Sequence, residues 1–171
     1  ELIHLASLLH DDVIDEANIR RGKPSINALF GSKNSVMLGD ILYSKAYFEL
    51  TKFESSIAAV ISDAVSKLSI GEMMDVKMAE NFNENEQEYL KMIYYKTAVL
   101  IEATAICGAK LAGKDSEEFG IYGKNLGLAF QIVDDILDIT QDEKTLGKPA
   151  LNDFVEGKTT LPYIYLYKSL D

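Results

Sequence analysis

Two short aspartate-rich stretches constrain the fold of this chain more than any other feature. Residues 11–15 read DDVID and residues 134–138 read DDILD, and each stretch interrupts an otherwise apolar run. In an α-helix the first and fifth positions lie about one turn apart on the same face, so two carboxylates meet there. Like charges repel at that spacing, and unpaired carboxylates are costly beside a core. The fold must therefore place both stretches where a cation can neutralise them.

The available ligands indicate which cation this is. The stretches offer only carboxylate oxygens, and the single cysteine, Cys107, has no cysteine or histidine partner at a zinc spacing. Magnesium binds one or two carboxylates, keeps several waters and takes phosphate oxygens, so two clusters are typical of a clamp for a diphosphate. Basic side chains that could contact phosphate lie near the clusters or between them: Arg20, Arg21, Lys96, Lys148 and Lys158.

Composition and charge exclude several classes of protein. The chain has 171 residues, 47% of them hydrophobic, with a net charge of −10, which argues against nucleic acid or an anionic membrane as partner. There is no apolar run long enough to span a membrane and no signal-peptide pattern, so we expect a cytoplasmic protein. The chain starts and stops inside apparent helices. We therefore expect residues 1–171 to be one incomplete domain that lacks helices at both ends.

Apolar residues recur mostly at intervals of three and four, which predicts an all-α fold. Ser116 is expected to cap a helix, with two glutamates in its first turn. A polar stretch from Thr140 to Thr160 is expected to be a long loop, followed by a helix from Leu161. The other helices are expected over residues 2–17, 34–53, 55–80, 85–112 and 117–139.

Each feature also has a simpler structural interpretation. A single DDxxD stretch is more often a solvated acidic face, and a single lysine such as Lys96 more often extends along a helix surface into solvent. The repeat of the stretch, with paired arginines soon after the first copy, favours a functional site. His10 is expected to pack or to hydrogen-bond, Asp75 to support a lysine of the site, and tyrosines such as Tyr89 to fill the core.

The motifs in their order closely resemble the trans-type polyprenyl diphosphate synthases. The resemblance covers nearly the whole chain and rests on LLHDDVID (8–15), RRG (20–22), GD (39–40), KT (96–97), FQIVDDILD (130–138), GK (147–148) and GKTTLP (157–162). It implies the isoprenoid synthase fold, a bundle of long, mostly antiparallel helices around a deep central cavity, and it implies a homodimer. It also implies condensation of isopentenyl diphosphate with an allylic diphosphate such as farnesyl diphosphate.

The resemblance assigns a role to each matching residue. Three magnesium ions would bind Asp11, Asp15 and Asp134, assisted by Asp12, Asp135 and Asp138. The allylic diphosphate would contact Arg20, Lys96, Gln131 and Lys148, and isopentenyl diphosphate would contact His4 and Arg21. Lys96 and Thr97 would stabilise the allylic cation. The upstream glycine-lysine-arginine motif that completes the second substrate site in the family is absent from this chain.

Product length in this family depends on the residues four and five positions before the first aspartate. Here these are Ser7 and Ala6, whereas aromatic residues at these positions accompany short products. The small side chains predict an open floor and a medium or long product, as in octaprenyl-type synthases of quinone side-chain synthesis.

Three other classes of protein share parts of this pattern. A non-catalytic subunit of a heteromeric prenyl synthase usually loses aspartates from its clusters, and both clusters are intact here. A terpene cyclase or a head-to-head synthase also uses aspartates and magnesium, but RRG and KTTLP fit chain elongation better. A non-catalytic metal-binding bundle would bind magnesium without any dependence on diphosphate.

Overall fold

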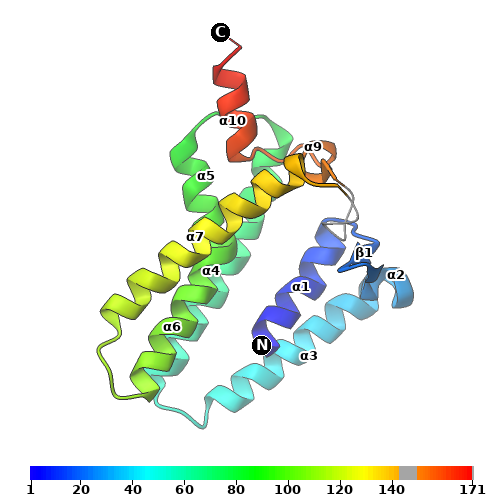
Figure 1. Cartoon of the computed structure of the whole chain (residues 1–171). Coiled ribbons are helices and arrows are strands. Elements are labelled where there is room, and N and C mark those ends of the chain that lie inside the picture. Colours follow the sequence, from blue (N-terminus) through cyan, green and yellow to red (C-terminus); the bar gives the residue numbers. More distant parts are fainter. Residues whose placement is uncertain (143–149, 171) are drawn as a thin grey trace. The chain divides into compact units, whose positions relative to one another are not determined.

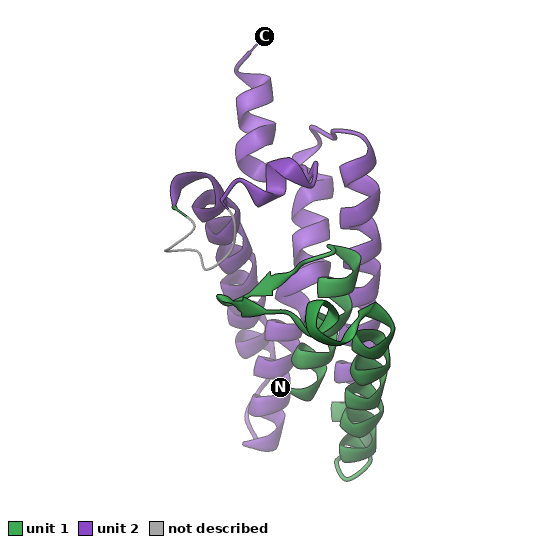
Figure 2. Cartoon of the chain, turned by 90° about the vertical axis from the view of Figure 1, so that its right-hand side faces the viewer, with its two compact units in different colours: residues 1–58, 142–149 green, residues 59–141, 150–171 purple. Residues whose placement is uncertain are grey.

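The computed structural model describes residues 1–142 and 150–170 and confirms the all-α prediction. The chain divides into two compact units, coloured separately in Figure 2, which comprise residues 1–58 with 142–149 and residues 59–141 with 150–171. The prediction of a single incomplete domain and that of a central cavity stay predictions.

The first unit is built on two long helices that run side by side, α1 (Leu2–Ile14) and α3 (Ser32–Leu50) (Figure 1). The buried residues of α1, Ile3, Ala6, Leu9 and Asp12, recur at an interval of three, which defines the packed face. A Cβ atom at Gly39 of α3 would lie 2.4 Å from the His10 ring nitrogen Nε2. Glycine at this position therefore lets the two helices approach.

The segment after α1 differs from the predicted helix to residue 17. The helix ends at Ile14, and a short hairpin follows in which β1 (Ile19–Arg20) pairs antiparallel with β2 (Lys23–Pro24). The two turn residues, Arg21 and Gly22, have φ angles of 52° and 72°, as a tight primed hairpin turn requires. The helix α2 (Ile26–Phe30) then leads into α3, and its Ser25 cap accepts a hydrogen bond from the Ala28 N–H.

The second unit is a group of helices with its own apolar core. Its core cluster contains Tyr89, Ile93, Met78, Met92 and Ile164, all less than 9% exposed. Its helices are α4 (Ser55–Glu80, which begins in the first unit), α5 (Glu86–Ile93), η1 (Tyr94–Ala98), α6 (Val99–Leu111), α7 (Glu117–Thr140), α9 (Asn152–Val155) and α10 (Leu161–Lys168).

The predicted helix over residues 85–112 is interrupted by the π-helical turn η1, which carries Lys96. Neighbouring helices approach the backbone here very closely. A Cβ atom at Gly71 would lie 2.3 Å from the Lys96 backbone nitrogen, and one at Gly127 would lie 2.4 Å from the Cα of Ala98. Both glycines therefore allow α4 and α7 to clamp the turn. Single π turns of this kind frequently occur at functional sites.

Two smaller expectations need correction. Ser116 precedes α7 as predicted but makes no side-chain cap; Asp115 instead accepts a hydrogen bond from the Glu117 N–H at 3.0 Å. The predicted loop between Thr140 and Thr160 contains the short helix α9. In the part of the chain that the structure describes, every helix is too short or too polar to cross a membrane.

Candidate active site

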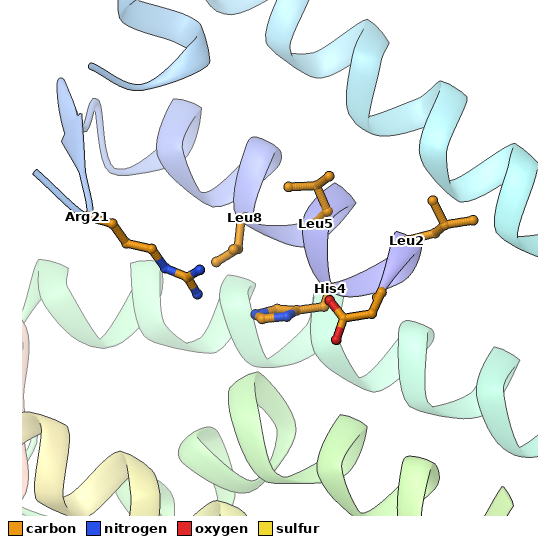
Figure 3. Close-up of a pocket in the computed structure, with 6 residues that line it drawn as sticks. Leu2, His4, Leu5, Leu8 and Arg21 are labelled. Atoms are coloured by element: carbon orange, nitrogen blue, oxygen red, sulfur yellow. The ribbon is translucent and has the colours of Figure 1, made fainter. Parts of the chain in front are cut away.

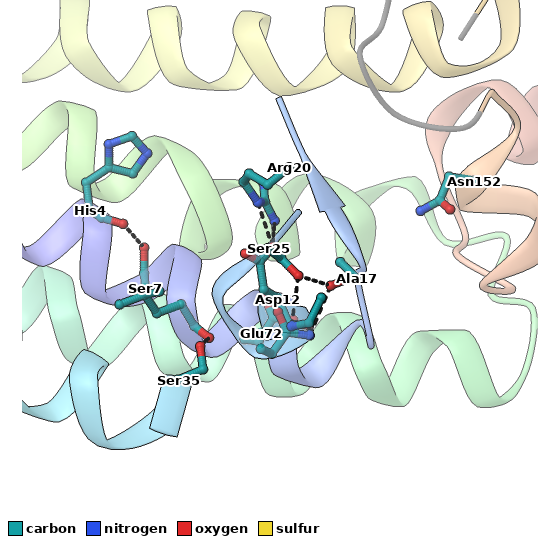
Figure 4. A network of polar contacts seen from close by, with 12 residues as sticks. His4, Ser7, Asp12, Ala17, Arg20, Ser25, Ser35, Glu72 and Asn152 are labelled. Carbon is teal, nitrogen blue, oxygen red and sulfur yellow. Dashed lines mark hydrogen bonds and ion pairs between the residues drawn. The ribbon is translucent and has the colours of Figure 1, made fainter. Parts of the chain in front are cut away.

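The first aspartate cluster begins in the last turn of α1 and ends at Asp15, the C-cap of that helix, and its members differ in exposure. Asp11 and Asp15 are partly exposed, whereas Asp12 is 4% exposed. The Asp12 Oδ1 atom accepts a hydrogen bond from Arg20 Nε at 2.6 Å and lies 2.5 Å from Arg20 Nη2 (Figure 4). On α3, burial and the negative charge of Asp11 raise the pKa of Tyr43 to about 12. The structure thus gives Asp12 an arginine partner and leaves the other two carboxylates near the surface.

A second set of contacts fixes the loop that carries Arg20. The Asn27 amide donates to the backbone oxygens of Asp12 and Ala17, both at 3.0 Å. The Ser25 hydroxyl also donates to the Ala17 oxygen, at 2.6 Å (Figure 4). Buried donors that bind backbone oxygens hold an irregular segment in one conformation. The hairpin is therefore anchored to the end of α1.

His4 and Arg21, both predicted to contact isopentenyl diphosphate, line the same pocket of about 380 Å³. Figure 3 shows the Arg21 side chain extending along α1 toward the His4 ring, with Leu5 and Leu8 on the same helix. A pocket lined by a cation, an imidazole and apolar side chains suits a ligand with an anionic head and an apolar body. Their role in substrate binding stays a prediction.

The two positions predicted to set product length have different surroundings. Ser7 is partly exposed, and its hydroxyl donates to the His4 backbone oxygen at 2.9 Å. Ala6 has no exposed surface, and its backbone oxygen lies 3.3 Å from where a Cβ of Gly39 would be. Ala6 therefore does not line open space, contrary to the expectation, because α3 packs against α1 at this level.

In the second unit Lys96 lies between two carboxylates of α4. Its ammonium is 2.5 Å from Asp75 Oδ2 and 3.0 Å from Glu72 Oε2. Asp75 is 5% exposed and Glu72 is 8% exposed. The sequence-based expectation that Asp75 supports a lysine of the site agrees with this contact. Two buried carboxylates therefore fix the position of the Lys96 ammonium.

Four side chains around the second aspartate cluster form a chain of hydrogen bonds. Thr97 Oγ1 donates to Gln131 Oε1 at 2.8 Å, and Gln131 Nε2 donates to Asp135 Oδ1 at 2.8 Å. Tyr89 donates its hydroxyl to Asp135 Oδ2 at 2.6 Å. Burial raises the pKa of the Asp135 carboxyl, and the bonds from Tyr89 and Gln131 oppose this rise. Three predicted site residues are thus linked directly.

The remaining members of the second cluster also differ in exposure. Asp134 is partly exposed. Asp138 has no exposed surface, and its Oδ2 atom accepts a hydrogen bond from the Asp153 N–H at 3.2 Å, which ties α7 to α9. Lys158 pairs with Glu156 at 2.5 Å. Lys148, predicted to contact the allylic diphosphate, lies outside the described residues.

Sequence reasoning missed several supporting residues. Tyr89 was expected only to fill the core, yet its hydroxyl binds a cluster aspartate. Glu72, Ser25 and Asn27 were given no role. A polar residue in an apolar stretch is the available signal for Glu72, whereas no signal separates Tyr89 from a core aromatic residue or Ser25 and Asn27 from ordinary loop residues.

The donor chemistry of the partly exposed aspartates fits magnesium. Asp11 and Asp15 are four residues apart and offer only oxygen, and Asp134 does the same on α7. Among the described residues, no three histidine, cysteine, aspartate or glutamate side chains are grouped as a metal site. Magnesium does not need such a group, because it usually takes one or two carboxylates and completes its octahedron with water and phosphate oxygens.

Comparison with known proteins gives consistent matches. The family model described as polyprenyl synthetase matches residues 1–171. The octaprenyl diphosphate synthase of Escherichia coli is 44% identical over 169 residues, covering 96% of this chain and 52% of that protein. Solanesyl diphosphate synthase 2, chloroplastic, of Arabidopsis thaliana is 40% identical, covering 96% of this chain and 40% of that protein.

Solved structures agree with these sequence matches. The crystal structure of octaprenyl pyrophosphate synthase from Helicobacter pylori superposes with a TM-score of 0.94 and 56% identity, covering 99% of this chain and 56% of that one. The polyprenyl synthase from Caulobacter crescentus, complexed with calcium and isoprenyl diphosphate, gives a TM-score of 0.94 and 38% identity, covering 98% of this chain and 52% of that one. The chain spans about half the length of the curated relatives it matches.

Proposed function

Because the chain belongs to the polyprenyl synthetase family, we propose that the protein is a prenyltransferase that condenses isopentenyl diphosphate with an allylic diphosphate. One observation carries the proposal. In each aspartate cluster the second aspartate is buried and hydrogen-bonded to a side chain predicted to contact substrate, Arg20 in one and Gln131 in the other. Solvated acidic faces do not show this pattern, because their carboxylates stay in water.

Product length and biological use belong to the same proposal. Relatives of this chain are named octaprenyl and solanesyl diphosphate synthases, and a similar solved structure is a decaprenyl diphosphate synthase. We propose a medium or long trans-polyprenyl diphosphate as the product, for quinone side chains. We also propose a homodimer, as the family resemblance implies, and a cytoplasmic location.

The residues of each unit have separate tasks in this proposal. In the first unit, His4 and Arg21 bind isopentenyl diphosphate, and Arg20 binds the allylic diphosphate. In the second unit, Lys96 and Gln131 bind the allylic diphosphate. The allylic C–O bond breaks with its electron pair going to the diphosphate, the double bond of isopentenyl diphosphate attacks, and a proton leaves to the diphosphate. Cationic side chains favour breakage of the C–O bond because they stabilise the leaving diphosphate anion.

Magnesium would be held by Asp11, Asp15 and Asp134, about three ions in the presence of bound diphosphate, and when bound it supplies positive charge to the leaving group. The side chains of the protein then have to exclude water from the allylic cation. Leu5 and Leu8 beside the His4 pocket are apolar groups suited to that task.

The test is incorporation of labelled isopentenyl diphosphate with farnesyl diphosphate and magnesium, with products resolved by chain length. It is run on this chain and on the longer protein to which we expect it to belong. Long labelled products that disappear with EDTA are the expected result. Absence of label in the longer protein would contradict the proposal and favour a non-catalytic subunit.

A matched pair of variants separates the cluster from general charge effects. Asp11→Asn with Asp15→Asn should lower incorporation by on the order of 100-fold or more, because both carboxylates leave the cluster. Asp63→Asn removes an aspartate of α4 that is 63% exposed and pairs with Lys67. It should leave incorporation unchanged. Calorimetry adds a further control, since magnesium binding that is equally strong without an allylic diphosphate would indicate a simple metal-binding bundle.

A further inference from the structure

Tyr89, Asp135, Gln131 and Thr97 form one continuous chain of hydrogen bonds within the second unit. The links are Tyr89 to Asp135 at 2.6 Å, Gln131 to Asp135 at 2.8 Å and Thr97 to Gln131 at 2.8 Å. The chain begins in α5, passes through two residues of α7 and ends in η1. It therefore connects the core of the unit with a predicted catalytic residue.

The donors and acceptors of the network give each bond a direction. The Tyr89 hydroxyl donates to Asp135 Oδ2, and the Gln131 NH₂ group donates to Asp135 Oδ1. The Gln131 carbonyl oxygen then faces Thr97, whose hydroxyl must donate to it. A distance of 2.6 Å between Tyr89 and Asp135 falls in the range of a charge-assisted O–H···O⁻ bond. All protons in the chain therefore point toward Asp135.

Burial prevents this direction from reversing. Tyr89 has no exposed surface and Asp135 is 4% exposed. A buried hydroxyl or carboxylate that gave up its partner would lose a hydrogen bond without gaining one from water. Reversing the Gln131 amide would also point an NH₂ group at the Thr97 hydroxyl and a carbonyl at the carboxylate. Such a network is strongly directional because every member depends on its neighbours.

The end of the chain is held by the backbone as well. Thr97 is in the π-helical turn, whose neighbours Lys96 and Ala98 are approached at 2.3 Å and 2.4 Å by the Cβ positions of Gly71 and Gly127. Glycines at these points leave little space for the turn to shift. The Thr97 hydroxyl oxygen is therefore held in one position. Its proton is donated to Gln131, and its lone pairs are not used by this hydrogen bond.

We propose that Tyr89 and Asp135 are positioning residues that orient the Gln131 amide, so that Thr97 presents an oxygen lone pair, and not a proton, to the allylic substrate. The inference rests on the proposed function, in which Thr97 stabilises the allylic cation. Positive charge develops on the allylic carbons as the C–O bond breaks. An oxygen electron pair stabilises that charge, whereas a hydroxyl proton would oppose it. None of the four residues forms a bond or transfers a proton.

The inference gives Asp135 a task different from that of Asp134. Asp134 is the partly exposed member of the pair and is the proposed metal ligand, whereas both oxygens of Asp135 accept hydrogen bonds from protein groups. The concentration of magnesium that gives half-maximal activity separates the two tasks. Asp134→Asn should raise the magnesium concentration at half-maximal activity. Asp135→Asn should lower kcat and leave that magnesium concentration unchanged. A rise of more than about threefold for Asp135→Asn would overturn the assignment.

The kinetic test is Tyr89→Phe in the longer protein. Phenylalanine keeps the ring but removes the proton donor, so Asp135 no longer holds a single orientation. We expect kcat to fall about tenfold, which is less than for direct loss of a stabilising group, while KM for farnesyl diphosphate changes less than about twofold. The change appears in kcat because the cation exists only in the transition state. A kcat within about twofold of the wild-type value would overturn the inference.

Tyr163→Phe is the matched control. Within the described residues the Tyr163 hydroxyl is buried and has no hydrogen-bond partner. Its removal is the same chemical change in the same unit, so kcat should stay unchanged. Equal losses of kcat in both variants would indicate a general packing effect and would overturn the positioning role.

A second readout needs no catalysis. The shift in urea midpoint caused by Thr97→Val is measured in the wild-type chain and in the Tyr89→Phe background. If the bonds act as one chain, Thr97→Val should lower the midpoint less in the variant background, because Gln131 is already released. Equal shifts of the urea midpoint in the two backgrounds would show that Tyr89 and Thr97 are not coupled, and would overturn the proposal. If the wild-type protein transfers no prenyl group but the shifts differ, the proposed function fails while the network stands.

Discussion

Asp12 and Arg20 show how one residue pair links the helix α1 to the hairpin that follows it. Asp12 is 4% exposed and continues the buried series of Ile3, Ala6 and Leu9. A carboxylate on the packed face of a helix needs a partner, and Arg20 provides two nitrogen contacts to one oxygen. The pair places the guanidinium beside the C-terminal end of α1, where Asp11 and the C-cap Asp15 lie. Asp12 therefore orients Arg20 in addition to any effect on metal.

We expect Asp12→Asn to lower the free energy of unfolding by about 1–2 kcal/mol, because a charged hydrogen bond is lost while the arginine keeps partial access to water. The Arg20 side chain is 37% exposed, which limits the loss. Urea unfolding measures the difference. Asp63→Asn, which breaks an exposed pair with Lys67, should cost less than about 0.5 kcal/mol. Equal costs for the two variants would contradict the distinct role of Asp12.

The sequence predicted which residue types form the site, but it did not predict which aspartates are buried with protein partners and which are partly exposed. The structure places Asp11 in the last turn of α1 and Asp15 at the cap position directly after it, where the Asp15 N–H donates to the Asp11 backbone oxygen at 2.8 Å. The period of three through Ile3, Ala6 and Leu9 also points to Asp12 as the buried member, and that signal went unused. Partners such as Tyr89 could not be found, because a hydrogen bond across 46 residues depends on packing that the local pattern does not contain.

Among the elements, the π-helical turn η1 most affects the site. The apolar pattern over residues 85–112 predicts one continuous helix, and the structure interrupts it at Tyr94–Ala98. A π turn inserts one residue into the helical register, so the apolar periodicity on either side looks unbroken in a short window. Close contact of Gly71 and Gly127 with this turn is the packing feature that accompanies the insertion.

Gly127→Ala should strongly disturb the turn. The new Cβ would lie 2.4 Å from the Ala98 Cα, and backbone cannot give way as a flexible side chain does, so we expect a loss of about 1–3 kcal/mol in unfolding free energy. Gly108→Ala is the control, because nothing lies within 4 Å of its Cβ position on α6. It should stabilise the chain by about 0.5–1 kcal/mol. Thermal or urea unfolding of both variants gives the comparison. Similar changes in unfolding free energy in both variants would rule out that close packing at Gly127 holds the turn η1.

At the scale of the whole molecule, helix order and fold class follow from the sequence, because the three-to-four periodicity extends over most of the chain. The division into two compact units does not, since it depends on contacts between residues far apart in sequence. The predicted site residues are divided accordingly. His4, Arg20 and Arg21 lie in the first unit, and Lys96 and Gln131 lie in the second.

Product length is a property of the whole molecule that two neighbouring positions can test. Ser7→Phe adds an aromatic ring at a partly exposed position, so we expect shorter products with little loss of stability. Ala6→Phe adds the same ring where no surface is exposed and where α3 packs against α1. Overpacking there should lower the free energy of unfolding by about 1–3 kcal/mol.

Chromatography of labelled products and thermal unfolding of both variants measure the two effects separately. Shorter products from Ser7→Phe at near wild-type stability would place this side chain against the growing prenyl tail. Unchanged product length in an active Ser7→Phe variant would move the length limit to another part of the protein. The helix α3 would then be the next element to test, because Ile41, 60% exposed, is one of its accessible apolar side chains. A shortening by Ala6→Phe alone would mean that repacking of α1 against α3, and not direct contact, controls length.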